Sequence, residues 1–162
     1  MRLISDRERR ECDKLKEAMG DWIASNNFTL FGTATYIHPK NVKIEKAHRD
    51  ASHYVRLLSR RILGKHLVDR KNIYLPMMMF VERGRNRDNT HLHFFTKGYT
   101  IKHTKQIITY ANDIWQSKID YALDVVIKDE YEAQRRTYTM KEQLALDDEI
   151  LCPKACFIPK LS

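Results

Sequence analysis

The chain has 162 residues, of which 43% are hydrophobic and 31% are charged, and its 29 Lys and Arg residues outnumber its 21 Asp and Glu residues. These proportions are typical of one soluble globular domain, which we expect to span residues 1–162. No apolar stretch approaches the ~20 residues of a membrane-spanning helix, and the charged N-terminus lacks the apolar segment of a secretory signal. We therefore expect no membrane partner and a cytoplasmic location. The formal net charge of +8 favours a polyanionic partner, most often nucleic acid.

Hydrophobic periodicity and turn residues predict an alternation of helices and strands. In chain order the expected elements are an amphipathic N-terminal helix (5–24), a Thr-rich strand (28–37), a long helix (43–68), two strands (73–83 and 90–97), a helix (102–117), a strand (121–127) and a final helix (130–144). This order predicts an α+β fold in which a mainly antiparallel sheet of about four to five strands carries helices packed on it, with an extra N-terminal helix. The core would cover about residues 28–144, followed by a loosely docked C-terminal tail at 145–162.

Two features have a structural and a functional interpretation. The long helix carries Arg56, Arg60, Arg61 and Lys65 on its polar side, which is either solvated surface or a DNA contact. The cysteines are Cys12, Cys152 and Cys156, and this odd number predicts free thiols in a reducing compartment. Cys152 and Cys156 are spaced like half of a zinc site, but no second Cys or His pair lies near them in the sequence, so we do not expect zinc there.

The segment from Glu82 to Phe95 has the most informative pattern. Alternate side chains of a strand share a face, so His91 and His93 should point the same way while Leu92 points into the core. Glu82 ends the preceding apolar run, and a hairpin would bring it beside the histidines. Two imidazoles and a carboxylate suit Mn²⁺ or Mg²⁺ better than a closed structural zinc site.

A second pattern lies in the final predicted helix. Tyr138 and Lys141 are three residues apart and therefore share a helix face. A phenol is a poor nucleophile at its free pKa of about 10, but a nearby ammonium and a metal-polarised phosphate would let it attack phosphorus. Taken alone, the pair is better explained by a core tyrosine with a surface lysine, and it gains a functional interpretation only beside the histidine pair.

These motifs together resemble the HUH single-strand endonucleases, in the branch of single-tyrosine rolling-circle replication initiators (Rep proteins). Phe31 to Tyr36 looks like their Thr-containing first motif. His91-Leu92-His93 looks like their His-hydrophobic-His motif, with Glu82 as the acidic third ligand, and Tyr138 to Lys141 looks like their Tyr-x-x-Lys motif. The resemblance covers about residues 28–143 and implies an HUH/RRM-like palm fold. Tyr131 lies seven residues before Tyr138, which is not the spacing of a two-tyrosine initiator, so we interpret it as a packing residue.

The resemblance implies metal-assisted transesterification of single-stranded DNA at a replication origin, which can be a hairpin. Glu82, His91 and His93 would hold Mn²⁺ or Mg²⁺, while Tyr138 would form a 5′-phosphotyrosine bond and Lys141 would stabilise the reacting groups. Basic residues near the site would bind the strand through its phosphates, and we expect them to be Arg83, Arg85, Arg87, Arg135 and Arg136. Thr33 and Thr35 are assigned to the sheet and the substrate path. No P-loop occurs, so unwinding and synthesis would need the helicase and polymerase of a prokaryotic host that carries a plasmid or phage.

Two alternatives stay open at this point. A single-strand transposase of the same superfamily would use the same histidine pair. A non-catalytic, basic, single-stranded nucleic-acid-binding module with an RRM-like sheet would instead carry aromatic pairs on adjacent central strands and would need no metal.

Overall fold

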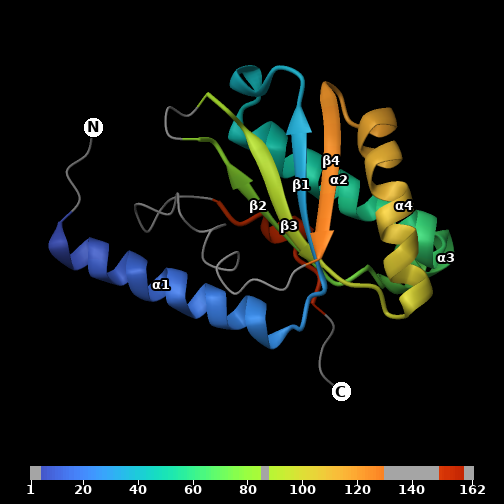
Figure 1. The fold of residues 1–162 in the computed structure, drawn as a ribbon, viewed down its shortest axis with the longest axis horizontal. Helices are drawn as coiled ribbons and strands as arrows, with labels where there is room; N and C mark the ends of the chain where they lie inside the picture. The colour runs from blue at the N-terminus through green and yellow to red at the C-terminus, as the bar shows by residue number, and fades with distance from the viewer. Residues whose placement is uncertain (1–4, 85–87, 130–149, 159–162) are drawn as a thin grey trace.

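A four-stranded antiparallel sheet in the order β2-β3-β1-β4 forms the centre of the computed structural model, which describes residues 5–84, 88–129 and 150–158 (Figure 1). The strands are β1 (Leu30–Tyr36), β2 (Met77–Glu82), β3 (His91–Thr96) and β4 (Ala122–Asp129). The helices are α1 (Asp6–Ser25), α2 (Ile44–Leu63), α3 (Lys65–Lys71) and α4 (Ile101–Lys118), with 3-10 turns η1 (Pro39–Asn41) and η2 (Pro153–Ala155). The predicted α+β fold, antiparallel sheet and N-terminal helix are confirmed. The helix predicted at 130–144 lies outside the described residues.

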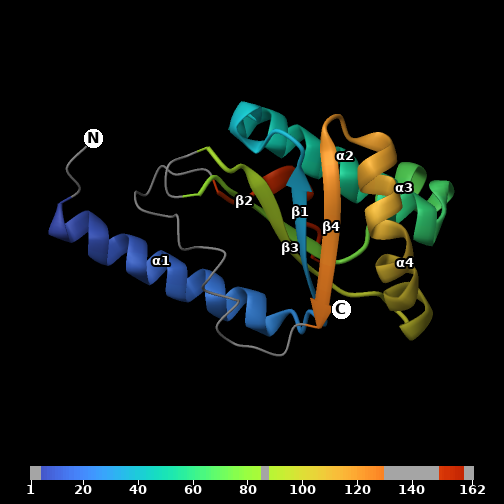
Figure 2. The ribbon, with the colours of Figure 1, turned by 45° about the horizontal axis from the view of Figure 1, so that its top comes forward.

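One face of the sheet packs against α2 and α4. Side chains alternate along each strand, so Leu30 and Ala34 of β1 point to the same face as Leu92 of β3, and all three are buried there. Figures 1 and 2 show α2 crossing behind the strands. Burial of the apolar stripes on the two helices supplies the main stabilisation of this layer. None of the described helices combines the length and the apolar character that a bilayer span requires.

Aromatic rings fill the centre of this layer. Phe94 of β3 contacts Tyr54 of α2 with ring centroids 6.1 Å apart, and Tyr54 meets Trp115 of α4 edge-on at 5.3 Å. The Phe94 ring lies across β1 at Gly32, where an added Cβ would be 2.0 Å from the tip of the ring. Glycine is thus required at this point of the strand by the close approach of a ring, not by backbone conformation.

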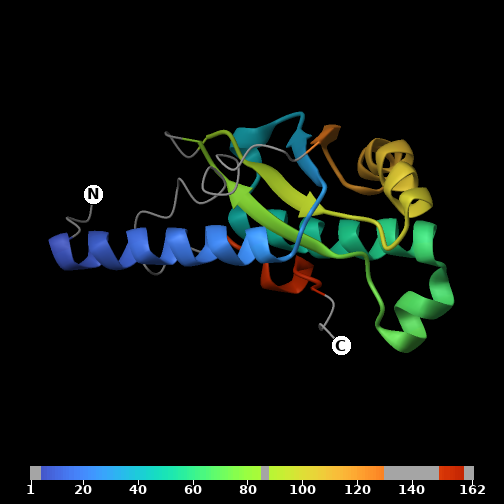
Figure 3. The ribbon, with the colours of Figure 1, turned by 60° about the horizontal axis from the view of Figure 1, so that its bottom comes forward.

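The opposite face is divided between an apolar end and a polar end. At the apolar end, Phe31 of β1, Phe80 of β2 and Phe95 of β3 form a buried cluster with Ile23 of α1 and Ile150. The rest of α1 runs outward, and its N-terminal end lies away from the sheet in all three views (Figures 1, 2 and 3). The polar end carries His91, His93 and Glu82, because these residues alternate in phase with the phenylalanines along their strands.

The predicted long helix over 43–68 is divided in two. Gly64 has φ of +92°, a conformation that L side chains rarely adopt, and it separates α2 from α3. The break lets Asp69 of α3 turn back to bind Arg56 and Arg60 of α2, and the hydrogen bond from Arg60 lowers the pKa of Asp69. Hydrophobic periodicity does not reveal this break, because the apolar positions continue on both sides of it.

The prediction of a loosely docked C-terminal tail is wrong for residues 150–158. This segment forms backbone hydrogen bonds along the outer edge of β2: Val81 N donates to Ile150 O at 2.7 Å, and Cys152 N donates to Met79 O at 2.9 Å. Phe157 then exchanges two backbone hydrogen bonds with Met77, at 2.8 and 2.9 Å. The segment therefore covers an edge strand whose polar groups would otherwise need water, and sequence patterning does not show such edge pairing.

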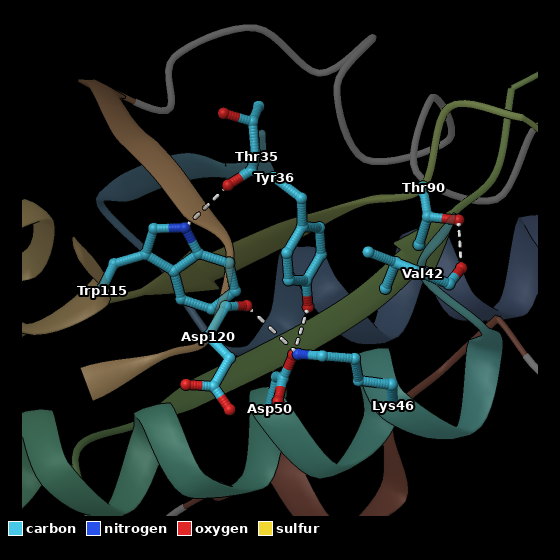
Figure 4. Close-up of polar contacts among 8 residues, drawn as sticks. All are labelled: Thr35, Tyr36, Val42, Lys46, Asp50, Thr90, Trp115 and Asp120. Carbon is cyan, nitrogen blue, oxygen red and sulfur yellow. Dashed lines mark hydrogen bonds and ion pairs between the residues drawn. The ribbon is translucent and has the colours of Figure 1, made fainter. Parts of the chain in front are cut away.

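A polar network fixes the end of β1 that lies nearest the histidines (Figure 4). Tyr36 Oη donates to Asp50 at 2.9 Å, and Lys46 bridges Asp50 to the carbonyl of Asp120. Burial and the adjacent carboxylate raise the pKa of Tyr36, so the phenol stays a donor. Just before the neighbouring strand β3, Thr90 donates to the Val42 carbonyl at 2.9 Å, which fixes the chain directly before His91.

Gly32→Ala should lower the free energy of unfolding by about 1–3 kcal/mol, because the methyl group would force the Phe94 ring out of the core. Urea denaturation of the variant and the wild type measures the loss. Gly32→Ala combined with Phe94→Leu should be more stable than the sum of the two single changes predicts. Strictly additive effects would contradict the steric explanation.

Candidate metal centre

The register of β2 and β3 brings the predicted metal ligands together. Glu82 lies directly opposite His91 in the antiparallel pair, and His93 lies two residues farther along β3 on the same face. His93 Nε2 is 2.8 Å from Glu82 Oε2, and His91 Nε2 is 3.5 Å from the same oxygen. The predicted contact between the carboxylate and both imidazoles is confirmed, and Leu92 is buried on the opposite face as expected.

The loop between the two strands holds this register. Asn89 N donates to Arg83 O at 3.0 Å, and Gly84 adopts φ of +70° at the exit from β2. A glycine accepts this conformation without the clash that a Cβ would bring. Because a slip of one residue would turn every side chain to the other face, the register that this contact closes decides whether Glu82 meets the histidines.

Each imidazole is held by groups outside the ligand set. The ring of His93 stacks on Phe31, with centroids 5.3 Å apart and planes 26° apart, and its Nδ1 lies 3.0 Å from Thr33 Oγ1. His91 Nδ1 donates to the backbone carbonyl of Asn89 at 2.8 Å. These contacts direct both Nε2 atoms toward Glu82, which is the arrangement that outer hydrogen bonds give to metal-binding histidines.

The spacing of the three ligand atoms fits a small divalent cation. Glu82, His91 and His93 each offer one ligand atom, and these atoms lie within 4.8 Å of one another. Adjacent ligands of an octahedral ion with bonds near 2.1 Å are about 3.0 Å apart, which lies between the observed 2.8 and 3.5 Å. Three protein ligands leave positions for water or substrate, as in catalytic rather than closed structural sites. Within residues 5–84, 88–129 and 150–158, this is the one such group of three.

Burial strengthens the case for a cation. Glu82 and His93 are each only 5% exposed. Removing a carboxylate from water costs several kcal/mol unless hydrogen bonds or a positive charge compensate it. Two imidazoles supply part of this compensation, and a bound divalent ion would supply more. The site therefore has a chemical reason to bind a cation as well as the geometry to do so.

The structure describes only some of the remaining predicted site residues. Arg83 follows Glu82 at the end of β2 and is half-buried. The other predicted residues lie outside the described part of the chain: Tyr138, Lys141, Arg85, Arg87, Arg135 and Arg136. Thr35 of β1 donates to the Asp124 carboxylate of β4. Thr35 thus lies on the strand next to the one that carries His91 but bonds away from it. On α2, the cations Arg56 and Arg60 bind Asp69 on the helical side of the sheet, so they do not belong to this centre.

The cysteines are not arranged as a metal site in the described residues. Cys152 and Cys156 are free thiols and lie at the two ends of η2. Burial raises the pKa of Cys156 to about 11 and also raises the pKa of Cys152. In the absence of a metal, thiols with such raised pKa values stay protonated at neutral pH and are poor nucleophiles.

Three contacts of the centre were missed in the sequence. Thr33 had been assigned to the sheet and the substrate path, although it contacts His93, and Phe31 was recognised only as part of a strand motif. Asn89 contributes a backbone carbonyl, which has no signature in the side-chain pattern. Thr33 and His93 lie on neighbouring strands, so only the β1–β3 register, Thr33 opposite His93, reveals their contact.

Comparison of the chain with protein-family models, with curated proteins and with solved structures finds no match in any of the three. The function is therefore inferred from the residues of the site and from their geometry.

Mn²⁺ at about 100 times its Kd should raise the free energy of unfolding by about 2.7 kcal/mol, because the ion binds the assembled site and not the unfolded chain. His91→Ala should remove this stabilisation, since it deletes one of three ligands. His66→Ala, at an exposed position on α3, is the matched control and should keep it. Equal stabilisation of His91→Ala and the wild type, measured by chemical denaturation with and without Mn²⁺, would place the ion elsewhere.

Proposed function

We propose that this protein is a metal-dependent endonuclease that nicks and rejoins single-stranded DNA through a covalent tyrosine intermediate, as rolling-circle replication initiators of the HUH superfamily do. The observation that carries the proposal is the buried group of Glu82, His91 and His93 on the sheet. Its two histidines come from one strand in the His-hydrophobic-His pattern, and its carboxylate comes from the neighbouring strand.

The order of the chain around the site supports the same function. The described chain leaves the sheet at the end of β4, at Asp129, and returns at Ile150, whose carbonyl accepts a hydrogen bond from Val81. Val81 directly precedes Glu82. In the sequence, the proposed nucleophile Tyr138 and its partner Lys141 lie between these two points and follow the histidine pair, in the motif order that the resemblance implies.

The chemistry assigned to the chain is a transesterification that conserves one phosphodiester bond. The Tyr138 oxygen forms a bond to phosphorus, the bond from phosphorus to the 3′ oxygen breaks, and this oxygen leaves with a proton as a 3′-hydroxyl. The ammonium of Lys141 stabilises the phenolate. A divalent cation held by Glu82, His91 and His93 would polarise the scissile phosphate and offset its developing charge. Attack by a later 3′-hydroxyl reverses the step, so no ATP is consumed.

Strand binding is assigned to the basic residues near the centre. Arg83 lies beside Glu82, and the proposal adds the arginines of the same loop and those before the tyrosine: Arg85, Arg87, Arg135 and Arg136. Contacts to phosphates supply affinity without sequence preference and make binding sensitive to salt. Single-stranded DNA at a replication origin, with a host helicase and polymerase acting on the nicked strand, completes the proposed context.

A specific observation weighs against the binding-module alternative. That alternative predicts aromatic pairs on adjacent central strands, and Phe31 of β1 does lie opposite Phe95 of β3 with ring centroids 5.1 Å apart. However, Phe31 is 8% exposed and Phe95 is 0% exposed, because both pack in the apolar cluster with Ile23. Buried rings cannot stack on nucleic-acid bases, so this pair serves the core.

Incubation with single-stranded oligonucleotides covering the replicon that encodes the protein should give a protein–DNA adduct that resists SDS. The adduct should form with Mn²⁺, disappear with EDTA, and be undetectable for Tyr138→Phe, because phenylalanine has no oxygen to bond to phosphorus. Denaturing gel electrophoresis measures it. Tyr131→Phe is the matched control and should form the adduct normally.

Tight binding of these oligonucleotides without any adduct would replace the nicking proposal with the binding module. Adduct formation by Tyr138→Phe would show that another residue is the nucleophile. Retention of the adduct in EDTA would show that the reaction does not need a metal at this centre.

A further inference from the structure

The two histidines of the centre have different partners at Nδ1. His91 Nδ1 lies 2.8 Å from the backbone carbonyl of Asn89, whereas His93 Nδ1 lies 3.0 Å from the hydroxyl of Thr33. A carbonyl only accepts hydrogen bonds, so His91 must carry its proton on Nδ1 to make this contact. A hydroxyl both donates and accepts, so the contact of His93 is compatible with either tautomer.

The Nε2 distances follow from this difference. His91 with its proton on Nδ1 presents a lone pair at Nε2, and this atom lies 3.5 Å from Glu82 Oε2, which is long for a hydrogen bond. His93 Nε2 lies 2.8 Å from the same oxygen, a hydrogen-bond distance. A carboxylate only accepts, so Nε2 of His93 carries a proton here, and in a neutral ring Nδ1 then accepts from Thr33 Oγ1.

A histidine that ligates a cation through Nε2 must offer the lone pair there and carry its proton on Nδ1. His91 already has this tautomer, but His93 does not. A 180° flip of the His93 ring would keep its stack on Phe31 but would lose the contacts of Nδ1 with Thr33 and of Nε2 with Glu82. His93 therefore becomes a ligand when its proton moves from Nε2 to Nδ1 while the ring keeps its orientation.

We propose that Thr33 is a positioning residue whose hydroxyl donates to His93 Nδ1 without a cation and accepts from Nδ1–H when His93 is a ligand. This inference rests on the metal centre of the proposed function and adds the residue that makes His93 able to serve both states. A residue that only accepts would fix the proton on Nδ1 and disrupt the contact of His93 with Glu82. A residue that only donates would oppose ligation.

The structure offers matched variants. Thr33→Val keeps the shape and the β-branch of threonine but removes the hydroxyl, and Thr33→Ser keeps the hydroxyl. Thr35→Val is the control, because Thr35 lies on the same face of β1 but bonds to Asp124 instead of an imidazole. Circular dichroism checks that all three variants fold.

Thr33→Val should weaken Mn²⁺ binding by about 10- to 100-fold in calorimetric titration, the usual effect of losing an outer partner of a metal-binding histidine. Thr33→Ser and Thr35→Val should bind within about 3-fold of the wild type. In ¹⁵N NMR of histidine-labelled wild-type protein, the His93 proton should lie on Nε2 without metal and on Nδ1 with the diamagnetic probe Zn²⁺, whereas the His91 proton should stay on Nδ1.

The results separate the two ideas. If Thr33→Val binds Mn²⁺ as tightly as the wild-type protein does, the role of Thr33 is overturned and the metal centre stays intact. A His93 proton on Nδ1 in the metal-free wild type would overturn it independently of any variant. Wild-type protein that binds no Mn²⁺ would overturn the metal centre of the proposed function itself.

Discussion

The register between β2 and β3 is the constraint on which the rest of the site depends. With Glu82 opposite His91, the carboxylate meets both imidazoles, and the phenylalanines that share their face fall in the apolar cluster. A slip of one residue would bury His91 and His93 in the helical layer and expose Leu92. The free energy of that layer therefore protects the ligand geometry, because the slipped pairing would lose the buried apolar surface that holds α2 and α4 on the sheet.

The same alternation lets one short sheet combine a core with a polar centre. The aromatic rings around Gly32 stabilise the helical face, while the other face carries a buried carboxylate that is costly without compensation. The imidazoles offset part of this cost locally, and the network of Tyr36, Lys46 and Asp50 anchors the nearby end of β1 (Figure 4). Strands rather than loops thus hold the three candidate metal ligands, Glu82, His91 and His93.

Much of this arrangement could be predicted from local patterns. Strand alternation predicted that His91 and His93 share a face, and a hairpin predicted the approach of Glu82. The features that were not predicted from the sequence depend on partners far away in the chain or on backbone conformation. The helix breaks at Gly64 because this residue has a positive φ. Residues 150–158 pair with β2 because this strand lies at the outer edge of the sheet. The contact of Thr33 with His93 depends on the register between strands about sixty residues apart in the sequence, which no periodicity reveals.

The central claim is that Glu82, His91 and His93 hold one divalent cation, and diffraction from crystals soaked in Mn²⁺, recorded at the manganese absorption edge, tests it most directly. The account predicts one strong anomalous peak about 2.0–2.3 Å from the two Nε2 atoms and a Glu82 oxygen, with other positions taken by water. Absence of a peak between β2 and β3, or a peak at other residues with this group vacant, would contradict it.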